Sequence, residues 1–255
     1  MTTRKRILLI GLIAIAAAAA IVAVAARVSN PRNAWRLGDL PTPMGFRRVE
    51  AQAGSYGAFL RDLPLKGRGS KVKLYTGGNA HFQFLSAAVL DIPVLSNDEQ
   101  CADMTMRLRA EYLWSQGRFG EICFTSLDGK RNPYTGGDTR KALESYLRRM
   151  YGICNTTSVF LETKERPLEE VQPGDVLVYK SRKKGRYGHA VLVADVAKSR
   201  DGRTAILCVE GNTPAREAHV VRNPDPFRNP WFIVSGKDGY QISAFRFRKD
   251  ELRHY

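Results

Sequence analysis

A stretch of residues without any charged side chain, from position 7 to position 26, constrains this chain more than any other feature. An α-helix needs about 20 apolar residues to cross the hydrocarbon core of a bilayer, and this stretch is long enough. The basic residues at positions 4–6 favour a cytoplasmic start, which sends the remainder of the chain outward. The small residues at positions 23–25 equally permit cleavage as a signal peptide. Both alternatives predict an extracytoplasmic domain, either anchored in the cell membrane by a single-pass helix or released from it.

The remainder of the chain divides into a short tether and one domain. Residues 27–45 contain Pro31, Pro41 and Pro43 and few apolar side chains, which is typical of an extended linker. Residues 46–255 are enough for one sizeable hydrophobic core but few for two. We therefore expect a signal anchor or signal peptide over residues 1–26, a tether over 27–45 and a single globular domain over 46–255.

The net charge of +15 predicts anionic neighbours, such as lipid head groups or an acidic envelope polymer. Nucleic acid is the usual alternative partner for a basic chain. The expected export argues against it, and so does the lack of a basic helix interleaved with aromatic residues for base stacking. A generally solvated basic surface with no specific partner explains the same charge.

The spacing of apolar residues predicts an α+β fold with an antiparallel sheet. Helices are expected over residues 54–63, 97–116 and 138–151, and strands over residues 71–75, 86–94, 176–179, 189–196 and 204–209. The helix over 97–116 has the clearest signature, because Ser96 and Glu99 have the spacing of a capping box. Its apolar stripe includes Cys101, Met104 and Leu108, which follow the three-four spacing of one buried face.

Cysteine and histidine spacing does not predict a metal site. The four cysteines are Cys101, Cys123, Cys154 and Cys208. An even number permits two disulfides with three pairings in an oxidising compartment, and Cys101 could belong to one of them. None of the cysteines forms a C-x-x-C pair, and His81, His219 and His254 lack companions at metal-ligand spacing. Phosphate-loop and dinucleotide fingerprints are also absent, so we expect neither metal nor cofactor.

Hydrolysis of an amide by a cysteine nucleophile requires a thiolate, an imidazole and a polar group that orients the imidazole. Cys101 follows Gln100 near the start of the expected helix, and His189 opens an apolar strand. Glu210 and Asn212 share one face near the end of the next strand, where a hairpin would bring one of them beside His189. Each residue also has an ordinary interpretation: a core cysteine, a hydrogen-bonded core histidine, and polar residues that end a strand.

Four short motifs in this chain resemble the cysteine, histidine-dependent amidohydrolase/peptidase (CHAP) and NlpC-type branch of the papain-like superfamily. They lie at residues 100–101, 173–175, 188–189 and 209–212. The resemblance implies an antiparallel sheet packed on a helix that bears the nucleophile, and activity on peptide bonds of bacterial cell walls. It also implies that Cys101 is the nucleophile, His189 the base, Glu210 or Asn212 the orienting group and Gln100 an oxyanion donor.

A second resemblance covers almost the whole expected domain. Residues 54–61, 100–112, 188–197 and 214–224 are similar to an uncharacterised bacterial domain-of-unknown-function family. The resemblance implies that Cys101 belongs to the pattern of that family, whereas the other three cysteines do not. The chain departs from the pattern at Glu210, where a glutamine commonly stands.

Together these patterns predict a membrane-tethered cysteine amidase or peptidase of the cell envelope, acting on cell-wall peptide. The alternative is a non-catalytic envelope module of the same fold that binds wall or anionic polymer. The basic loop over residues 182–186, just before His189, either rims the site and favours acidic substrates or is an exposed hairpin tip.

Overall fold

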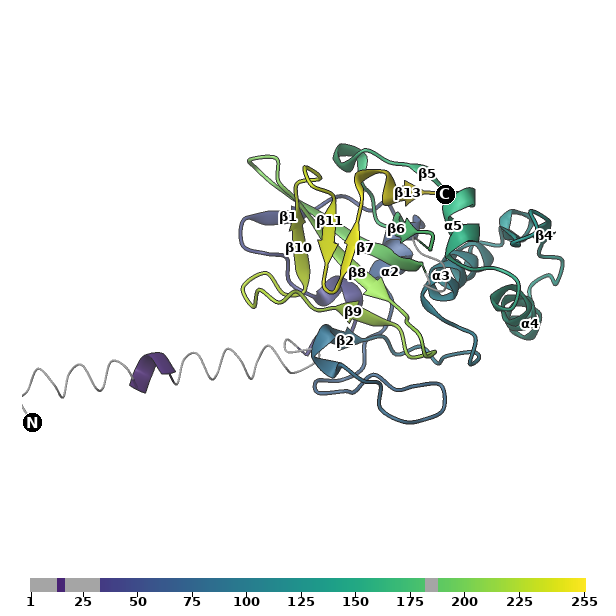
Figure 1. Cartoon of the computed structure of the whole chain (residues 1–255), viewed down its shortest axis with the longest axis horizontal. Coiled ribbons are helices and arrows are strands. Elements are labelled where there is room, and N and C mark those ends of the chain that lie inside the picture. Colours follow the sequence, from purple (N-terminus) through teal and green to yellow (C-terminus); the bar gives the residue numbers. More distant parts are fainter. Residues whose placement is uncertain (1–12, 17–32, 182–187) are drawn as a thin grey trace, which may run out of the picture.

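The computed structural model describes residues 13–16, 33–181 and 188–255, which form a mixed α+β structure around one large antiparallel sheet (Figure 1). The hydrophobic segment expected over residues 1–26 lies almost entirely outside the described residues, as does the basic loop over 182–186. Among the helices of the described ranges, none combines the length and the apolar character needed to span a bilayer.

The large sheet contains nine strands. They are β1 (Phe46–Arg48), β2 (Ser86–Val89), β5 (Lys164–Glu165), β6 (Val176–Tyr179), β7 (His189–Ser199), β8 (Thr204–Glu210), β9 (His219–Val221), β10 (Trp231–Val234) and β13 (Leu252–His254). The main path runs β2-β9-β8-β7-β6-β13-β5, with β1 also beside β7 and β10 also beside β8. Every pairing is antiparallel.

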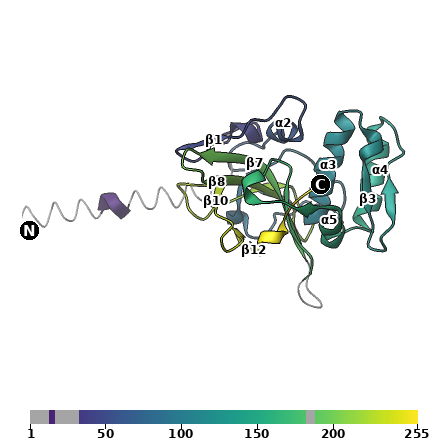
Figure 2. The same ribbon diagram turned by 90° about the horizontal axis from the view of Figure 1, so that it is seen from above.

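Helices and two small hairpins surround this sheet. The helices are α2 (Tyr56–Arg61), α3 (Cys101–Ser115), α4 (Arg140–Tyr151) and α5 (Thr156–Glu162), with short 3-10 helices at Leu37–Asp39, Gln83–Leu85, Phe119–Glu121, Leu168–Glu170 and Lys249–Glu251. The hairpins pair β3 (Cys123–Thr125) with β4 (Arg131–Pro133) and β11 (Tyr240–Ile242) with β12 (Phe245–Phe247). Helix α3 lies beside the sheet, and α4 and the β3–β4 hairpin lie on the far side of α3 (Figure 1 and Figure 2).

The central strand β7 is buried on both faces. Side chains of adjacent strand residues point to opposite faces of a sheet. Ala190 and Leu192 accordingly belong to the same apolar cluster as Met104 of α3, whereas Val191 belongs to a second cluster with Phe247 of β12. This double burial explains the uninterrupted apolar sequence at the start of β7.

The expected start of the long helix near Ser96 is wrong, because α3 begins at Cys101. The Glu99 carboxylate turns back to accept a hydrogen bond from the Leu95 N–H at 2.6 Å, so residues 96–99 form a turn. The capping box forms four residues later than expected, at Gln100, whose N–H donates a hydrogen bond to the Asp103 carboxylate at 2.9 Å. Cys101 is therefore the first residue of the helix.

Two expected strands also differ from the structure. Residues 71–75 form only isolated bridges, from Lys73 to Asn79 and from Leu74 to Arg216. The strand expected over residues 86–94 is shorter, because β2 ends at Val89. Pro93 lacks the N–H that a longer ladder would require.

A buried carboxylate fastens the N-terminal part of the domain to β7. Asp195 has no exposed surface, and its two oxygens accept hydrogen bonds from Arg48 of β1 at 2.6 Å and from Arg61 of α2 at 2.7 Å. Arg61 also donates to the carbonyl of Val49. Two guanidinium groups thus neutralise one buried charge, which a low-dielectric interior requires.

Candidate active site

Three polar side chains form a row across neighbouring strands of the sheet. His189 is the first residue of β7, Glu210 is the last residue of β8, and His219 is the first residue of β9. Glu210 pairs directly with His219 in the ladder. The β7–β8 register pairs Leu192 with Val209, which puts His189 and Glu210 on the same face as diagonal neighbours.

The Glu210 carboxylate lies between the two histidine rings. Its Oε2 is 3.0 Å from Nε2 of His189, and its Oε1 is 3.3 Å from Nε2 of His219. The Nδ1 of His219 lies 3.2 Å from the carbonyl oxygen of Glu217. All three side chains of the row are buried. A charged group in such a place requires hydrogen-bond partners, and the row supplies them.

The hydrogen bonds hold Glu210 in its ionised form. Burial alone would raise the pKa of this carboxyl, but the hydrogen bonds from His189 and His219 outweigh burial and lower the pKa to about 2. Glu210 is therefore a permanent anion at neutral pH, and it fixes the orientation of both rings.

Cys101, the first residue of α3, contacts the His189 ring of this row. Its side chain is buried, and its thiol is free rather than joined in a disulfide. The positive end of a helix dipole stabilises negative charge, so the first helical residue is a favourable position for a thiolate. Burial lowers the pKa of His189, but hydrogen bonds with Cys101 and Glu210 outweigh burial and raise the pKa to about 9. The ring of His189 thus links the sulfur to the carboxylate.

Phe245 of β12 covers the His189 ring. The two rings are stacked with centroids 3.6 Å apart and an interplanar angle of 20°. Neither Phe245 nor His219 was recognised from the sequence as part of this cluster. His219 carried a usable signal, because it opens the short apolar strand β9 as His189 opens β7. Phe245 carried none, because its hairpin is distant in sequence.

Gln100 and Asn212 lie near the cluster but do not bond to His189. The Gln100 Oε1 accepts a hydrogen bond from the Thr213 hydroxyl at 2.8 Å, and the Asn212 Oδ1 accepts one from the Thr213 N–H at 2.8 Å. Within residues 33–181 and 188–255, no hydrogen bond joins either side chain to His189, whereas Glu210 has one. Of the two candidates for the orienting group, the structure brings Glu210 to the ring.

A small cavity of about 130 Å³ opens beside Cys101. Gln100, Thr156, Gly188 and Thr213 contribute to its wall. Polar and apolar atoms both line it, and Gln100 and Asn155 contribute side-chain amides that can donate to a substrate oxygen. In the described part of the chain, no group of His, Cys, Asp or Glu side chains has the arrangement needed to hold a metal ion.

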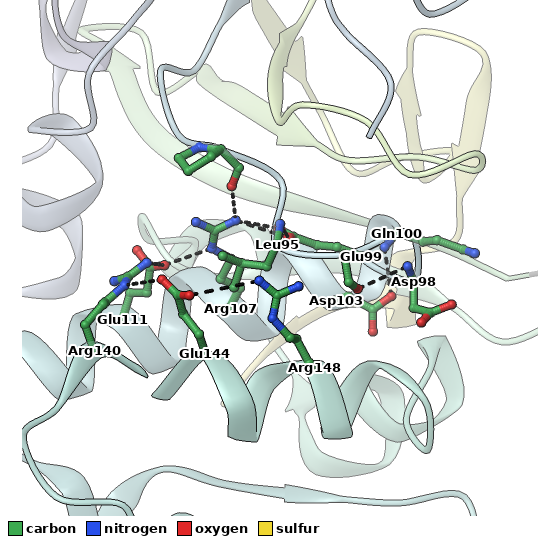
Figure 3. Close-up of polar contacts among 12 residues, drawn as sticks. Leu95, Asp98, Glu99, Gln100, Asp103, Arg107, Glu111, Arg140, Glu144 and Arg148 are labelled. Atoms are coloured by element: carbon green, nitrogen blue, oxygen red, sulfur yellow. Dashed lines mark hydrogen bonds and ion pairs between the residues drawn. The ribbon is translucent and has the colours of Figure 1, made fainter. Parts of the chain in front are cut away.

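A network of ion pairs anchors α3 behind the cysteine. Figure 3 shows Arg107 between Glu99 and Glu111, with Gln100 pointing away from this network. Arg107 donates to Glu99 and to Glu111, each at 2.8 Å, and it also donates to the carbonyl of Pro93. Because Glu99 precedes Gln100 directly, this network fixes the turn that leads into Cys101.

Gly188 permits the close packing of the segment before His189 against β6 and α5. A Cβ at this position would lie 2.2 Å from the carbonyl oxygen of Tyr179 and 2.3 Å from Oγ1 of Thr156, the first residue of α5. We expect Gly188→Ala to lower the unfolding free energy by about 1–3 kcal/mol, because the chain must move to relieve this overlap. Gly120→Ala is the control, since nothing lies within 4 Å of its added Cβ. Denaturant unfolding of both variants measures the difference, and equal stabilities would contradict the packing described here.

Fold and site together define an α+β domain in which a free cysteine at a helix start contacts a buried histidine–glutamate pair. The family described as domain of unknown function 4846 matches residues 38–136 and 134–254, so the chain belongs to that family. Comparison with curated proteins and comparison with solved structures gave no match.

Proposed function

We propose that this protein is a cysteine hydrolase of papain-like type that cleaves amide bonds, with Cys101 as the nucleophile. The observation that carries the proposal is the contact chain from the Cys101 thiol through the His189 ring to the Glu210 carboxylate. Amide hydrolysis by a thiol requires three groups: a nucleophile, a proton carrier and an orienting anion. The resemblance of the surrounding motifs to CHAP and NlpC-type enzymes supports the same assignment.

The proposed reaction proceeds through a thioester. His189, with a pKa of about 9, holds a proton at neutral pH, and such a cation can stabilise the thiolate form of a neighbouring cysteine. The thiolate attacks the carbonyl carbon, and His189 gives its proton to the nitrogen of the departing amine. Water then attacks the thioester while His189 accepts its proton, which releases the acid and restores the thiolate beside the protonated ring.

Neighbouring groups support these steps in distinct ways. The Glu210 carboxylate is hydrogen-bonded to Nε2 of His189. The other ring nitrogen, Nδ1, is therefore the one that exchanges a proton with Cys101 in the proposed reaction. The first N–H groups of a helix lack intrahelical partners and can donate to the developing oxyanion. The Gln100 amide nitrogen is a second donor, since the Gln100 oxygen already accepts from Thr213.

We further propose that the domain acts outside the cytoplasm, held at the membrane by the segment over residues 1–26. The basic composition suits an anionic envelope polymer or a cell-wall peptide as substrate. Release of free amino groups from peptidoglycan fragments by the wild type, and not by Cys101→Ala, would identify such a substrate.

The pH dependence of Cys101 alkylation tests the proposal. An ordinary cysteine has a pKa of about 8.5 and is less than about 1% ionised at pH 6. We expect iodoacetamide to modify Cys101 at pH 6, and we expect His189→Ala to slow this reaction roughly 100-fold, because the thiolate loses its cationic partner. Peptide mass spectrometry of the full-length protein follows each cysteine separately, and the half-buried Cys123 provides an internal reference.

Two results would count against a thiol hydrolase. Equal alkylation rates at Cys101 in the wild type and in His189→Ala would favour a non-catalytic binding module. Labelling of Cys101 only after reduction would indicate a disulfide in the native protein. The exposed His81→Ala serves as the matched histidine control and should leave the rate unchanged.

A further inference from the structure

A second, larger cavity adjoins the Cys101–His189–Glu210 cluster. Its volume is about 640 Å³, which lies within the range of small-molecule binding sites. Glu210, His219 and Phe245 contribute to one end of its wall. Thr213 lines both this cavity and the small one beside Cys101. A ligand in the larger cavity would therefore lie next to the reacting groups.

Two exposed aromatic rings form part of the wall of this cavity. Phe82 is 66% exposed and Phe84 is 56% exposed, and their rings are nearly perpendicular, edge to face, with centroids 6.0 Å apart. Phe82 has a φ of 58°, a left-handed conformation that is uncommon for a bulky side chain and costs energy. The strained backbone and the exposure of two large apolar side chains both cost free energy of folding. Contact with a ligand would offset the cost of exposing these rings.

The segment that carries these rings is held in place. The Gln83 side-chain amide donates to the carbonyl of Ala80 at 2.7 Å and to that of Val72 at 2.9 Å. The Gln83 Oε1 accepts the Val72 N–H at 2.9 Å. These three hydrogen bonds fix the backbone between the two phenylalanines, so the aromatic wall is organised before any ligand arrives.

One cationic side chain faces the same cavity. Arg216 donates hydrogen bonds to the carbonyl oxygens of Pro214 and Thr213, at 3.1 Å and 2.9 Å. Among residues 33–181 and 188–255, no carboxylate forms an ion pair with Arg216. The carboxylate of Glu210 also lines the cavity, but two histidine rings already hold its oxygens. Arg216 is therefore a half-buried positive charge that an anionic ligand can neutralise.

We propose that this cavity binds the specificity group of an anionic amide substrate: a bulky apolar side chain against Phe82 and Phe84, with a carboxylate directed at Arg216. The inference rests on the proposed function, because Thr213 connects this cavity to the place where Cys101 would attack the scissile bond. It adds that the substrate combines an apolar side chain with a negative charge.

Binding of two matched fluorescent probes tests this inference. The anionic probe is 1-anilinonaphthalene-8-sulfonate, and the neutral probe is N-phenyl-1-naphthylamine, which has the same rings without the sulfonate. Titrations use the full-length Cys101→Ala protein, so that no reaction at the sulfur contributes. We expect added Phe82→Ala and Phe84→Ala substitutions each to weaken both probes about tenfold, because apolar contact area is lost. Arg216→Gln should weaken the anionic probe about tenfold and leave the neutral probe unchanged.

The control is Phe227→Ala, which removes an 86% exposed ring that does not line the cavity and should not change either affinity. Unchanged affinity in both Phe82→Ala and Phe84→Ala would overturn the inference, provided that circular dichroism shows them folded. Equal weakening of both probes by Arg216→Gln would overturn the assignment of a carboxylate. Probe binding does not require Cys101, and alkylation of Cys101 does not require the aromatic wall. Failure of this inference and failure of the proposed function are therefore distinguishable.

Discussion

Between pH 6 and pH 9.5, wild-type protein is expected to lose about 3 kcal/mol more unfolding free energy than the His189→Gln variant. The pKa of His189 in the folded protein is about 9, against an ordinary value of 6.5. A raised histidine pKa means that the protonated ring stabilises the folded state. This contribution is fully present below pH 6.5 and disappears as the pH rises through 9.

Other buried groups also titrate in this range, so the difference between the two proteins is the informative quantity. Burial raises the pKa of Asp103 to about 8 and that of Asp175 to about 7, and both effects are common to the wild type and the variant. Glu210 does not interfere, because its contribution is present above pH 4.5 and is lost only as the pH falls toward 2. Urea unfolding at several pH values measures the difference, with the exposed His81→Gln as control. Parallel pH profiles for the wild type and His189→Gln would show that His189 is not held as a cation.

Replacing Asp195 with alanine is expected to lower the unfolding free energy by about 3–5 kcal/mol, because the change leaves two partly buried guanidinium groups without their anion. Arg48 and Arg61 reach this carboxylate from β1 and α2, so the loss also weakens the packing of both elements on β7. Asp201→Asn is the matched control. Its ion pair with Arg203 is exposed, and removing an exposed pair has little effect on stability. If Asp195→Ala and Asp201→Asn unfold at the same urea concentration, the buried cluster does not hold the N-terminal part of the domain.

The three consecutive central strands could be predicted from the sequence, whereas the short strands β9, β10 and β13 beside them could not. Strand β6 occupies residues 176–179 as expected, and β7 and β8 extend the expected ranges by three residues and one residue. These strands combine apolar runs with flanking turn residues, which is a local signal. Strands β9, β10 and β13 have only three or four residues each, and distant partners stabilise them. Local sequence carries little information about such pairing.

The same distinction applies to the site. The proximity of His189 and Glu210 follows from alternation along a hairpin, which sequence can supply. The meeting of Cys101 with His189 depends on how α3 packs beside the sheet, and periodicity alone did not determine it. The capping pattern at Ser96 and Glu99 was misleading, because Glu99 bonds to Arg107 instead. His219 was missed although it opens an apolar segment, because its contact with Glu210 arises from pairing across the ladder.

Strand β7 has two separate attachments, one at each end. Asp195, in its second half, is fastened to β1 and α2, whereas His189 opens the strand between β6 and β8. A mechanical pull on the N-terminal side of the domain would load the carboxylate–guanidinium pairs and the β1–β7 ladder before it loaded the His189 end of β7. The ring that contacts the sulfur lies beyond that fastening, so under the proposed membrane attachment tension would be borne before it reached the reactive end of the strand.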